Sequence, residues 1–149
     1  NWLGTGWFND IPYQADMHCH PGLWDSPGVN GLAFDEDGNL YAVGRLNAAG
    51  FNVFKIRGTD GALMWQNTTG ALAHQHGVWY DTFSGLVTVV GVASSGWPDA
   101  GGQTTHLWRF NPASGEIVSH FYLEQPVTVY GVDVHPTTGK TIIVTDYIA

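Results

Sequence analysis

The sequence predicts an all-β fold made of four-stranded antiparallel sheets. Short segments led by glycine recur along the chain, and each one reads as a β-hairpin. Glycine is abundant, with 20 among 149 residues, and β-branched and aromatic residues recur between the glycines. No segment has apolar residues spaced with the 3.6-residue period of a helix. These observations predict strands throughout and essentially no helix.

Three of the recurring segments align with one another, and each predicts one hairpin. They are NGLAFDEDGNLYAVG (residues 30–44), HGVWYDTFSGLVTVVG (76–91) and YGVDVHPTTGKTIIVTD (130–146). In each, a glycine leads an alternating strand, and a second glycine closes a polar turn before the next strand. Alternation of period two on both arms is typical of a hairpin. The leading glycines are Gly31, Gly77 and Gly131, and the turn glycines are Gly38, Gly85 and Gly139.

A second hairpin follows each of the first two. FNVFKIRGTDGALMW (51–65) matches THLWRFNPASGEIVSHF (105–121), with turn glycines at Gly61 and Gly115. Four short strands every 46 to 54 residues is the spacing of a β-propeller blade. We therefore expect one partial propeller of about two and a half blades. Its expected parts are an initial segment (1–27), two blades (28–70 and 71–125) and the first hairpin of a third (126–149).

Two of these segments resemble known propeller families. NGLAFDEDGNLYAV resembles the inner hairpin of NHL and gluconolactonase-like propellers. FKIRGTDGALMW resembles the repeat of quinoprotein-type propellers, in which a strand leads into a Thr-Gly turn and then a Trp. The likeness covers most of residues 28–146 and implies blade architecture. Blades of this kind serve many functions, so the likeness does not select one.

The composition restricts the partners that we expect. The net charge is −8 with only five Lys and Arg residues, so we expect no nucleic-acid binding and no attraction to anionic membranes. No apolar run approaches the roughly 18 residues that membrane insertion needs. The single cysteine, Cys19, has no partner for an internal disulfide. Few charges, many aromatic residues and a sequon at Asn67 predict an extracellular or secreted glycoprotein.

Two His-x-His pairs are the candidate metal ligands, and they are His18 with His20 and His74 with His76. Residues i and i+2 of a strand point to the same face, so each pair can present two imidazoles together. Such a pair fits a divalent ion such as Zn, Ca or Cu, completed by water or a carboxylate. The reading that we favour is that these histidines hydrogen-bond backbone groups where the chain enters a blade. Direct contact with a ligand is a third possibility.

Further candidates come from the repeat and from the resemblance. His76 precedes Gly77, and the equivalent positions hold Asn30 and Tyr130, which are polar and suited to a propeller's central channel. In the gluconolactonase-like families, carboxylate and Asn side chains hold a metal in that channel. The resemblance implies that role for Asn30 and Asp146, although the glutamate of such a site has no counterpart here. Among the tryptophans, Trp24 and Trp97 are candidates to stack on sugars or to fill a protein interface.

We weigh three functions. The leading one is an extracellular, non-enzymatic propeller module for recognition or for scaffolding an assembly. Its expected partners are other protein chains, further blades of the same protein, and carbohydrate. The alternative is a metal-dependent hydrolase or lactonase of the gluconolactonase-like kind. The third is a quinoprotein-like oxidoreductase, suggested only by the Thr-Gly turn and the Trp.

Overall fold

The computed structural model describes residues 29–44, 51–69, 73–93, 104–123 and 129–145. These residues form an all-β structure without helix, as the sequence predicts. The first sheet contains β1 (Val29–Phe34), β2 (Leu40–Gly44), β3 (Val53–Ile56) and β4 (Leu63–Asn67). The second contains β5 (Ala73–Asp81), β6 (Leu86–Ala93), β7 (Thr104–Phe110) and β8 (Ile117–Leu123). The third contains β9 (Val129–Val134) and β10 (Thr141–Thr145).

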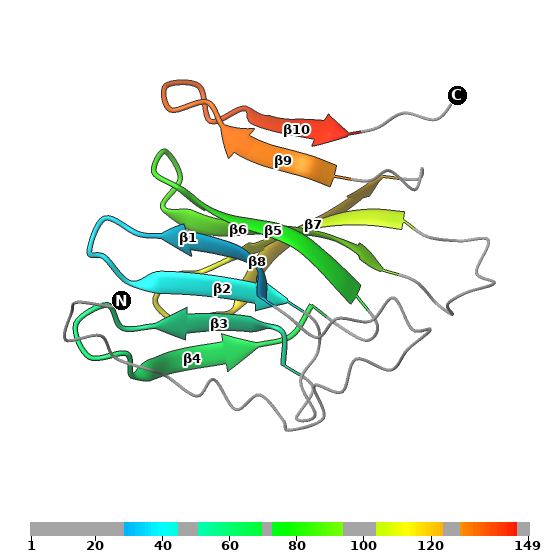
Figure 1. Ribbon diagram of the computed structural model, residues 1–149. Helices are drawn as coiled ribbons and strands as arrows, with labels where there is room; N and C mark the ends of the chain where they lie inside the picture. The colour runs from blue at the N-terminus through cyan, green and yellow to red at the C-terminus, as the bar shows by residue number, and fades with distance from the viewer. Residues whose placement is uncertain (1–28, 45–50, 70–72, 94–103, 124–128, 146–149) are drawn as a thin grey trace, which may run out of the picture.

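Each sheet is an antiparallel meander in which every strand pairs with the next one in sequence (Figure 1). The expected repeated units of strands are therefore present, with four strands in each of the first two sheets. Within the described residues, no sheet closes on itself. The same residues include no helix that is long and apolar enough to cross a membrane.

Glycine sets the tight turns of all five described hairpins. The turn glycines have φ between 65° and 78°, and they are Gly38, Gly61, Gly85, Gly115 and Gly139. This left-handed region costs an ordinary L-residue free energy because its Cβ is crowded there, whereas glycine adopts it freely. The repeated glycine in the sequence is thus the local cause of the repeated turn.

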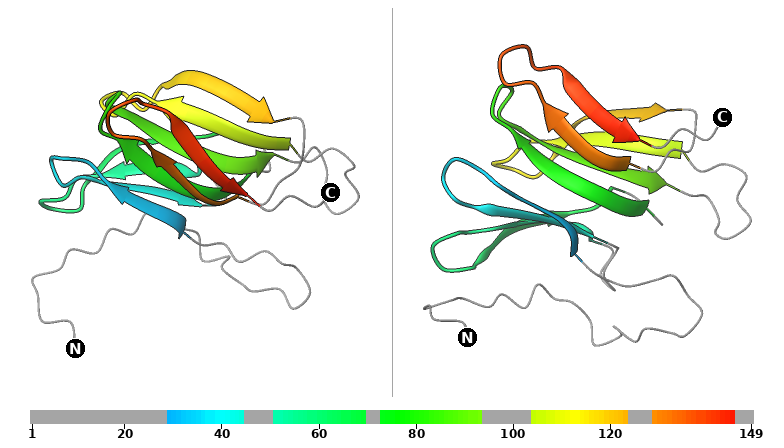
Figure 2. Two further views of the ribbon diagram at one scale, coloured as in Figure 1. Left: turned by 90° about the horizontal axis from the view of Figure 1, so that it is seen from above. Right: turned by 45° about the horizontal axis from the view of Figure 1, so that its top comes forward.

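The three sheets are stacked face to face (Figures 1 and 2). The first strands of the sheets, β1, β5 and β9, lie side by side in the stack. The large core cluster lies between the first and second sheets and includes Tyr41, Val43, Val78, Trp108 and Phe110. A smaller cluster of Val90, Leu107 and Val132 lies between the second and third sheets. Burial of each such side chain contributes about 1.5–3 kcal/mol, so these clusters hold the stack together.

The first two sheets approach each other closely at two leading glycines. A Cβ built on Gly31 would lie 2.9 Å from the Cα of Gly77, closer than real Cβ atoms come to a neighbour. Any larger residue at position 31 would therefore push β1 away from β5. The leading glycine of the first hairpin is there because two backbones meet without side chains between them.

Candidate functional site

A β-bulge occupies the same place in the first strand of every sheet. The pairing of β1 with β2 passes from Val29 to Gly31 and skips Asn30. The pairing of β5 with β6 skips His76 in the same way, and that of β9 with β10 skips Tyr130. Bulges add one unpaired residue to a strand, and they are common next to binding and active sites. The three polar positions that the repeat singles out are thus the three bulge positions.

These bulges form a row because the strands that carry them are neighbours. β5 lies between β1 and β9 in the stack, as the right-hand view of Figure 2 shows. The bulge at Asn30 directly precedes Gly31, and the one at His76 directly precedes Gly77, where the two strands come close together. We call positions 30, 76 and 130 the bulge row. It places one polar residue on the first strand of each sheet, and these three strands are neighbours in the stack.

Two of the other candidates predicted from the sequence, His74 and Asn67, lie within the described residues. His74 lies on β5 and pairs with Val92 on β6. Asn67 ends β4 and is partly buried; its amide nitrogen donates to the carbonyl of Gly115, and its side-chain oxygen accepts from the Thr68 amide at 2.7 Å. The remaining candidates lie outside the described residues, and they are His18, His20, Trp24, Trp97 and Asp146.

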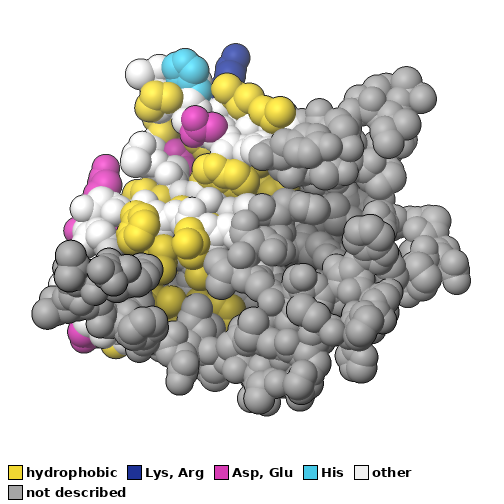
Figure 3. All heavy atoms as spheres, in the orientation of Figure 1, with side chains coloured by type: hydrophobic (Ala, Val, Ile, Leu, Met, Phe, Trp, Pro, Cys, Tyr) yellow, Lys and Arg dark blue, Asp and Glu magenta, His cyan; other side chains and the backbone are white. Residues whose placement is uncertain are grey.

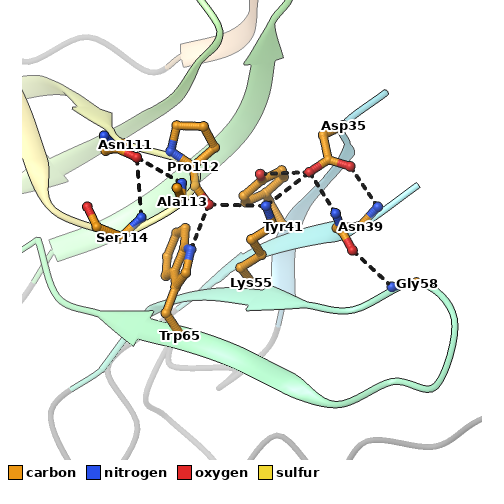
Figure 4. A network of polar contacts seen from close by, with 10 residues as sticks. All are labelled: Asp35, Asn39, Tyr41, Lys55, Gly58, Trp65, Asn111, Pro112, Ala113 and Ser114. Carbon is orange, nitrogen blue, oxygen red and sulfur yellow. Dashed lines mark hydrogen bonds and ion pairs between the residues drawn. The ribbon is translucent and has the colours of Figure 1, made fainter. Parts of the chain in front are cut away.

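A buried ion pair connects the first hairpin to the third strand (Figure 4). Lys55 on β3 contacts Asp35 at the end of the first hairpin strand, with Nζ 3.1 Å from Oδ2. Both side chains are buried. The same carboxylate accepts hydrogen bonds from the Tyr41 hydroxyl at 2.9 Å and from the backbone amide of Asn39 at 2.7 Å. The charge of Lys55 is therefore neutralised inside the protein, as a buried cation requires.

The same lysine also links the first sheet to the second (Figure 4). Its Nζ donates to the carbonyl oxygen of Pro112 at 3.1 Å, and that oxygen also accepts from the indole nitrogen of Trp65 at 2.9 Å. Pro112 belongs to the turn between β7 and β8. Two side chains of one sheet thus hold one carbonyl of the next, which fixes how the two sheets sit against each other.

The network shifts the pKa of both of its acidic groups. Burial acts to raise the pKa of Asp35, but hydrogen bonds from Asn39, Tyr41 and Lys55 outweigh it and hold that pKa below its ordinary value. Burial and the hydrogen bond to Asp35 raise the pKa of the Tyr41 hydroxyl far above its ordinary value. Asp35 is thus ionised and Tyr41 protonated at neutral pH. With its partners engaged within the protein, this network is suited to a structural role.

An equivalent cation joins the second sheet to the third. The register places Lys55 opposite Tyr41 and Arg109 opposite Thr88, at the same point of each repeat. Arg109 Nη2 donates to the hydroxyl of Thr141 on β10 at 3.0 Å. At both interfaces, a basic residue of the third strand reaches the following sheet. This role was not predicted, although alignment of FKIRG with WRFNP places Lys55 and Arg109 at the same position.

A second group that sequence analysis missed lies on β7 and β8. His106 Nδ1 and His120 Nε2 are 2.6 Å apart, and their ring planes differ by 15°. Both rings also lie near-parallel to the indole of Trp108, with ring centroids 5.2 and 5.1 Å away. Partial burial, and then the neighbouring His120, lower the pKa of His106 below its ordinary value. The pair is thus suited to share one hydrogen bond, with His106 neutral at pH 7.

Among the described side chains, no three His, Cys, Asp or Glu residues gather as metal ligands. The structure describes the backbone of His74 and His76 on β5, and a metal site at this pair stays a prediction. No family model matches the chain, and neither the curated proteins nor the solved structures give a match.

Proposed function

We propose that this chain is an extracellular, non-enzymatic module of the β-propeller type, which works in recognition or as a scaffold for assembly. The observation that carries the proposal is the repeated stacking of its sheets. Each meander packs one face against the next, and the first strands of neighbouring sheets lie beside each other. Four-stranded meanders packed in this way are the building units of propellers.

The bulge row supports the recognition part of the proposal. It gives each sheet one polar residue at the same bulge position, on the strands that lie together in the stack. Asn, His and Tyr side chains donate and accept hydrogen bonds, which suits them to a neutral polar ligand such as carbohydrate. The low content of basic residues disfavours phosphate-rich ligands.

The sequon is compatible with a secreted glycoprotein. N-glycosylation uses one of the two hydrogens on the Asn67 amide nitrogen and leaves the other for the Gly115 carbonyl. Mass spectrometry of the protein secreted from eukaryotic cells, before and after enzymatic deglycosylation, tests this assignment. Asn67→Gln, which keeps an amide at this position, is the matched control for the loss of a glycan.

Sedimentation velocity over a hundredfold range of protein concentration, combined with negative-stain imaging, tests the assembly role. We expect association that increases with concentration, and particles larger than a single 16.2 kDa chain. Isolated monomers at every concentration would remove the scaffold role and leave recognition alone. A carbohydrate-binding screen with the triple variant Asn30→Ala, His76→Ala and Tyr130→Ala as control then tests recognition.

A metal-dependent lactonase is the second candidate, favoured by the bulge at Asn30. That residue matches the channel Asn of the gluconolactonase-like families, and a bulge is a common setting for such a residue. Elemental analysis of protein purified without chelators discriminates the two proposals. Stoichiometric Zn, Ca or Cu in the parent protein, lost in the Asn30→Ala variant, would favour the lactonase. A parent protein without bound metal would exclude it.

A further inference from the structure

The two ends of the stack expose apolar side chains that the repeat elsewhere buries. At one end, the outward face of β1 carries Leu32 and Phe34, and we call this strip the β1 end face. At the other end, β10 carries Ile142 and Val144, the β10 end face. All four side chains are more than half exposed. Figure 3 shows hydrophobic side chains over the top of this view, where Figure 1 places β9 and β10.

Leu32 has two equivalents in the repeat, and both are buried. It follows Gly31, as Val78 follows Gly77 and Val132 follows Gly131. Leu32 is 59% exposed, whereas Val78 and Val132 are 4% exposed each. The position is therefore an interface position in the second and third sheets, and it is uncovered only where no described sheet lies against it.

Val144 has two buried equivalents in the same way. It pairs across the strands with Gly131, as Val43 pairs with Gly31 and Val90 with Gly77. Val144 is 56% exposed, whereas Val43 and Val90 are at most 1% exposed. Among the described residues, no heavy atom lies within 4 Å of a Cβ built on Gly131, so this face is open at its glycine as well.

The two buried sets belong to the same interfaces. Val43 of the first sheet and Val78 of the second share one core cluster. Val90 of the second sheet and Val132 of the third share the other. At each interface, the residue that follows the leading glycine of one sheet thus packs in the same cluster as a residue of the preceding sheet. That second residue is the one that pairs with the leading glycine of its own sheet. Leu32 and Val144 are the two halves of a third such pair, one at each end.

We propose that the β10 end face of one chain binds the β1 end face of a second copy, head to tail, with Val144 of one copy against Leu32 of the other. This inference rests on the proposed assembly role and specifies its interface. Its occupant is a second copy because the two free faces are the complementary halves of an interface that the chain already makes twice. Repetition of one heterologous contact closes a ring or extends a filament, depending on the rotation between copies.

The free part of the β1 end face is narrow. On β2 and β3 the same face is already buried at Ala42, Phe54 and Ile56. The contact is therefore confined to β1, the strand through which the first sheet also meets β5. On the β10 end face, Asp133 lies exposed opposite Ile142, and its charge opposes full burial there. Both features favour a weak association.

Site-directed disulfide formation tests the orientation of the contact. Leu32→Cys and Val144→Cys are prepared as separate full-length chains in a Cys19→Ser background, mixed, and oxidised mildly. We expect mixed Leu32→Cys/Val144→Cys dimers on non-reducing gels, confirmed by mass spectrometry, in excess over dimers of either variant with itself. The matched control is Val118→Cys, because Val118 on β8 is 55% exposed but lies on neither end face. Equal cross-linking to Val118→Cys, or a preference for same-variant dimers, would overturn the proposal.

Val144→Asp measures the contribution of the end face to association. Sedimentation velocity should show a loss of about tenfold or more in association constant, because a charge is buried at the contact. Val118→Asp should leave association unchanged, and both variants should unfold like the parent because both positions are exposed. Association that Val144→Asp does not weaken would refute this interface but keep the assembly role. An unmutated chain that is monomeric at all concentrations would refute both.

Discussion

The two interfaces between sheets are built from equivalent positions but differ in how well their polar groups are satisfied. Between the first and second sheets, Lys55 contacts both Asp35 and the Pro112 carbonyl. Between the second and third, Arg109 reaches Thr141 through Nη2. Among the described residues, however, Arg109 Nε and the hydroxyl of Thr88 are buried without a hydrogen-bond partner.

This difference shows that the repeat fixes the geometry of an interface while individual residues set its strength. The first interface has a large aromatic cluster and an ion pair whose partners are engaged. The second has the smaller cluster and polar atoms without partners, which cost free energy when buried. We therefore expect the third sheet to be the less firmly attached part of the described structure.

Among the variants that test this comparison, substitution of Lys55 should lower the free energy of unfolding the most. Lys55→Met keeps the length of the side chain but leaves the Asp35 carboxylate buried without its cation, so we expect a loss of about 3–5 kcal/mol in unfolding free energy. Urea denaturation followed by circular dichroism measures it. Arg57→Ala is the control, because the Arg57–Asp60 pair is exposed and its loss should leave the free energy of unfolding nearly unchanged. A Lys55→Met variant as stable as the control would show that the first interface does not depend on the ion pair.

Removal of one hydroxyl from the same network should have the next largest effect. Tyr41→Phe keeps the buried ring but deletes the hydrogen bond to Asp35, and we expect a loss of about 1.5–3 kcal/mol because the acceptor is charged. Denaturation of Tyr80→Phe alongside provides the comparison, since Tyr80 stacks on Tyr41 with ring centroids 6.1 Å apart. An equal loss in the two variants would mean that the Tyr41 hydroxyl contributes nothing specific.

At the second interface the equivalent substitution should act in the opposite direction. Thr88→Val replaces a buried hydroxyl that has no partner with a methyl group of similar shape. We expect stability to be unchanged or to rise by about 1 kcal/mol, because the cost of the unpaired hydroxyl disappears. Thermal denaturation of Thr88→Val beside Thr105→Val, also buried, measures the difference. A clear loss of stability in Thr88→Val would show that the second interface is as well satisfied as the first.

The smallest effect should be a pH dependence of stability that comes from His106. This residue lies on the same face of β7 as Trp108. Its pKa in the folded protein is below the ordinary value of 6.5, so between these two values the unfolded chain binds more protons than the folded one. Its contribution to stability is therefore complete above about pH 6.5 and declines as pH falls toward the folded pKa. Urea denaturation at pH 7.5, 6.0 and 5.0 should show this decline in the parent and a weaker one in His106→Phe. Parallel pH curves for the two proteins would assign the decline to other groups.

Some residues were open to prediction because their role is local. Gly38, Gly85 and Gly139 close short polar turns, and a turn of that kind needs positive φ whatever surrounds it. The equivalence of Asn30, His76 and Tyr130 also followed from alignment. Their bulges did not, because a bulge depends on the register between two strands and one extra residue leaves no sign in a single segment.

Other residues were not singled out because their surroundings come from distant parts of the chain. Lys55 in FKIRG lies on an apolar strand, and only the tertiary structure brings Asp35 and the Pro112 carbonyl to its buried side chain. A turn separates His106 from His120, and a bulge in the pairing of β7 with β8 sets which of their residues face each other. No spacing rule within one segment predicts that their ring nitrogens meet.

The sequence by itself determined the strands, the turns and the recurrence of the hairpin pair, because alternation and glycine act over a few neighbouring residues. Only the tertiary structure decided which faces are covered, which charge is buried and which apolar strips remain open. Those properties depend on the stacking of one sheet on another. Stacking brings together residues such as Trp65 and Pro112, which are 47 positions apart, and no local pattern extends that far.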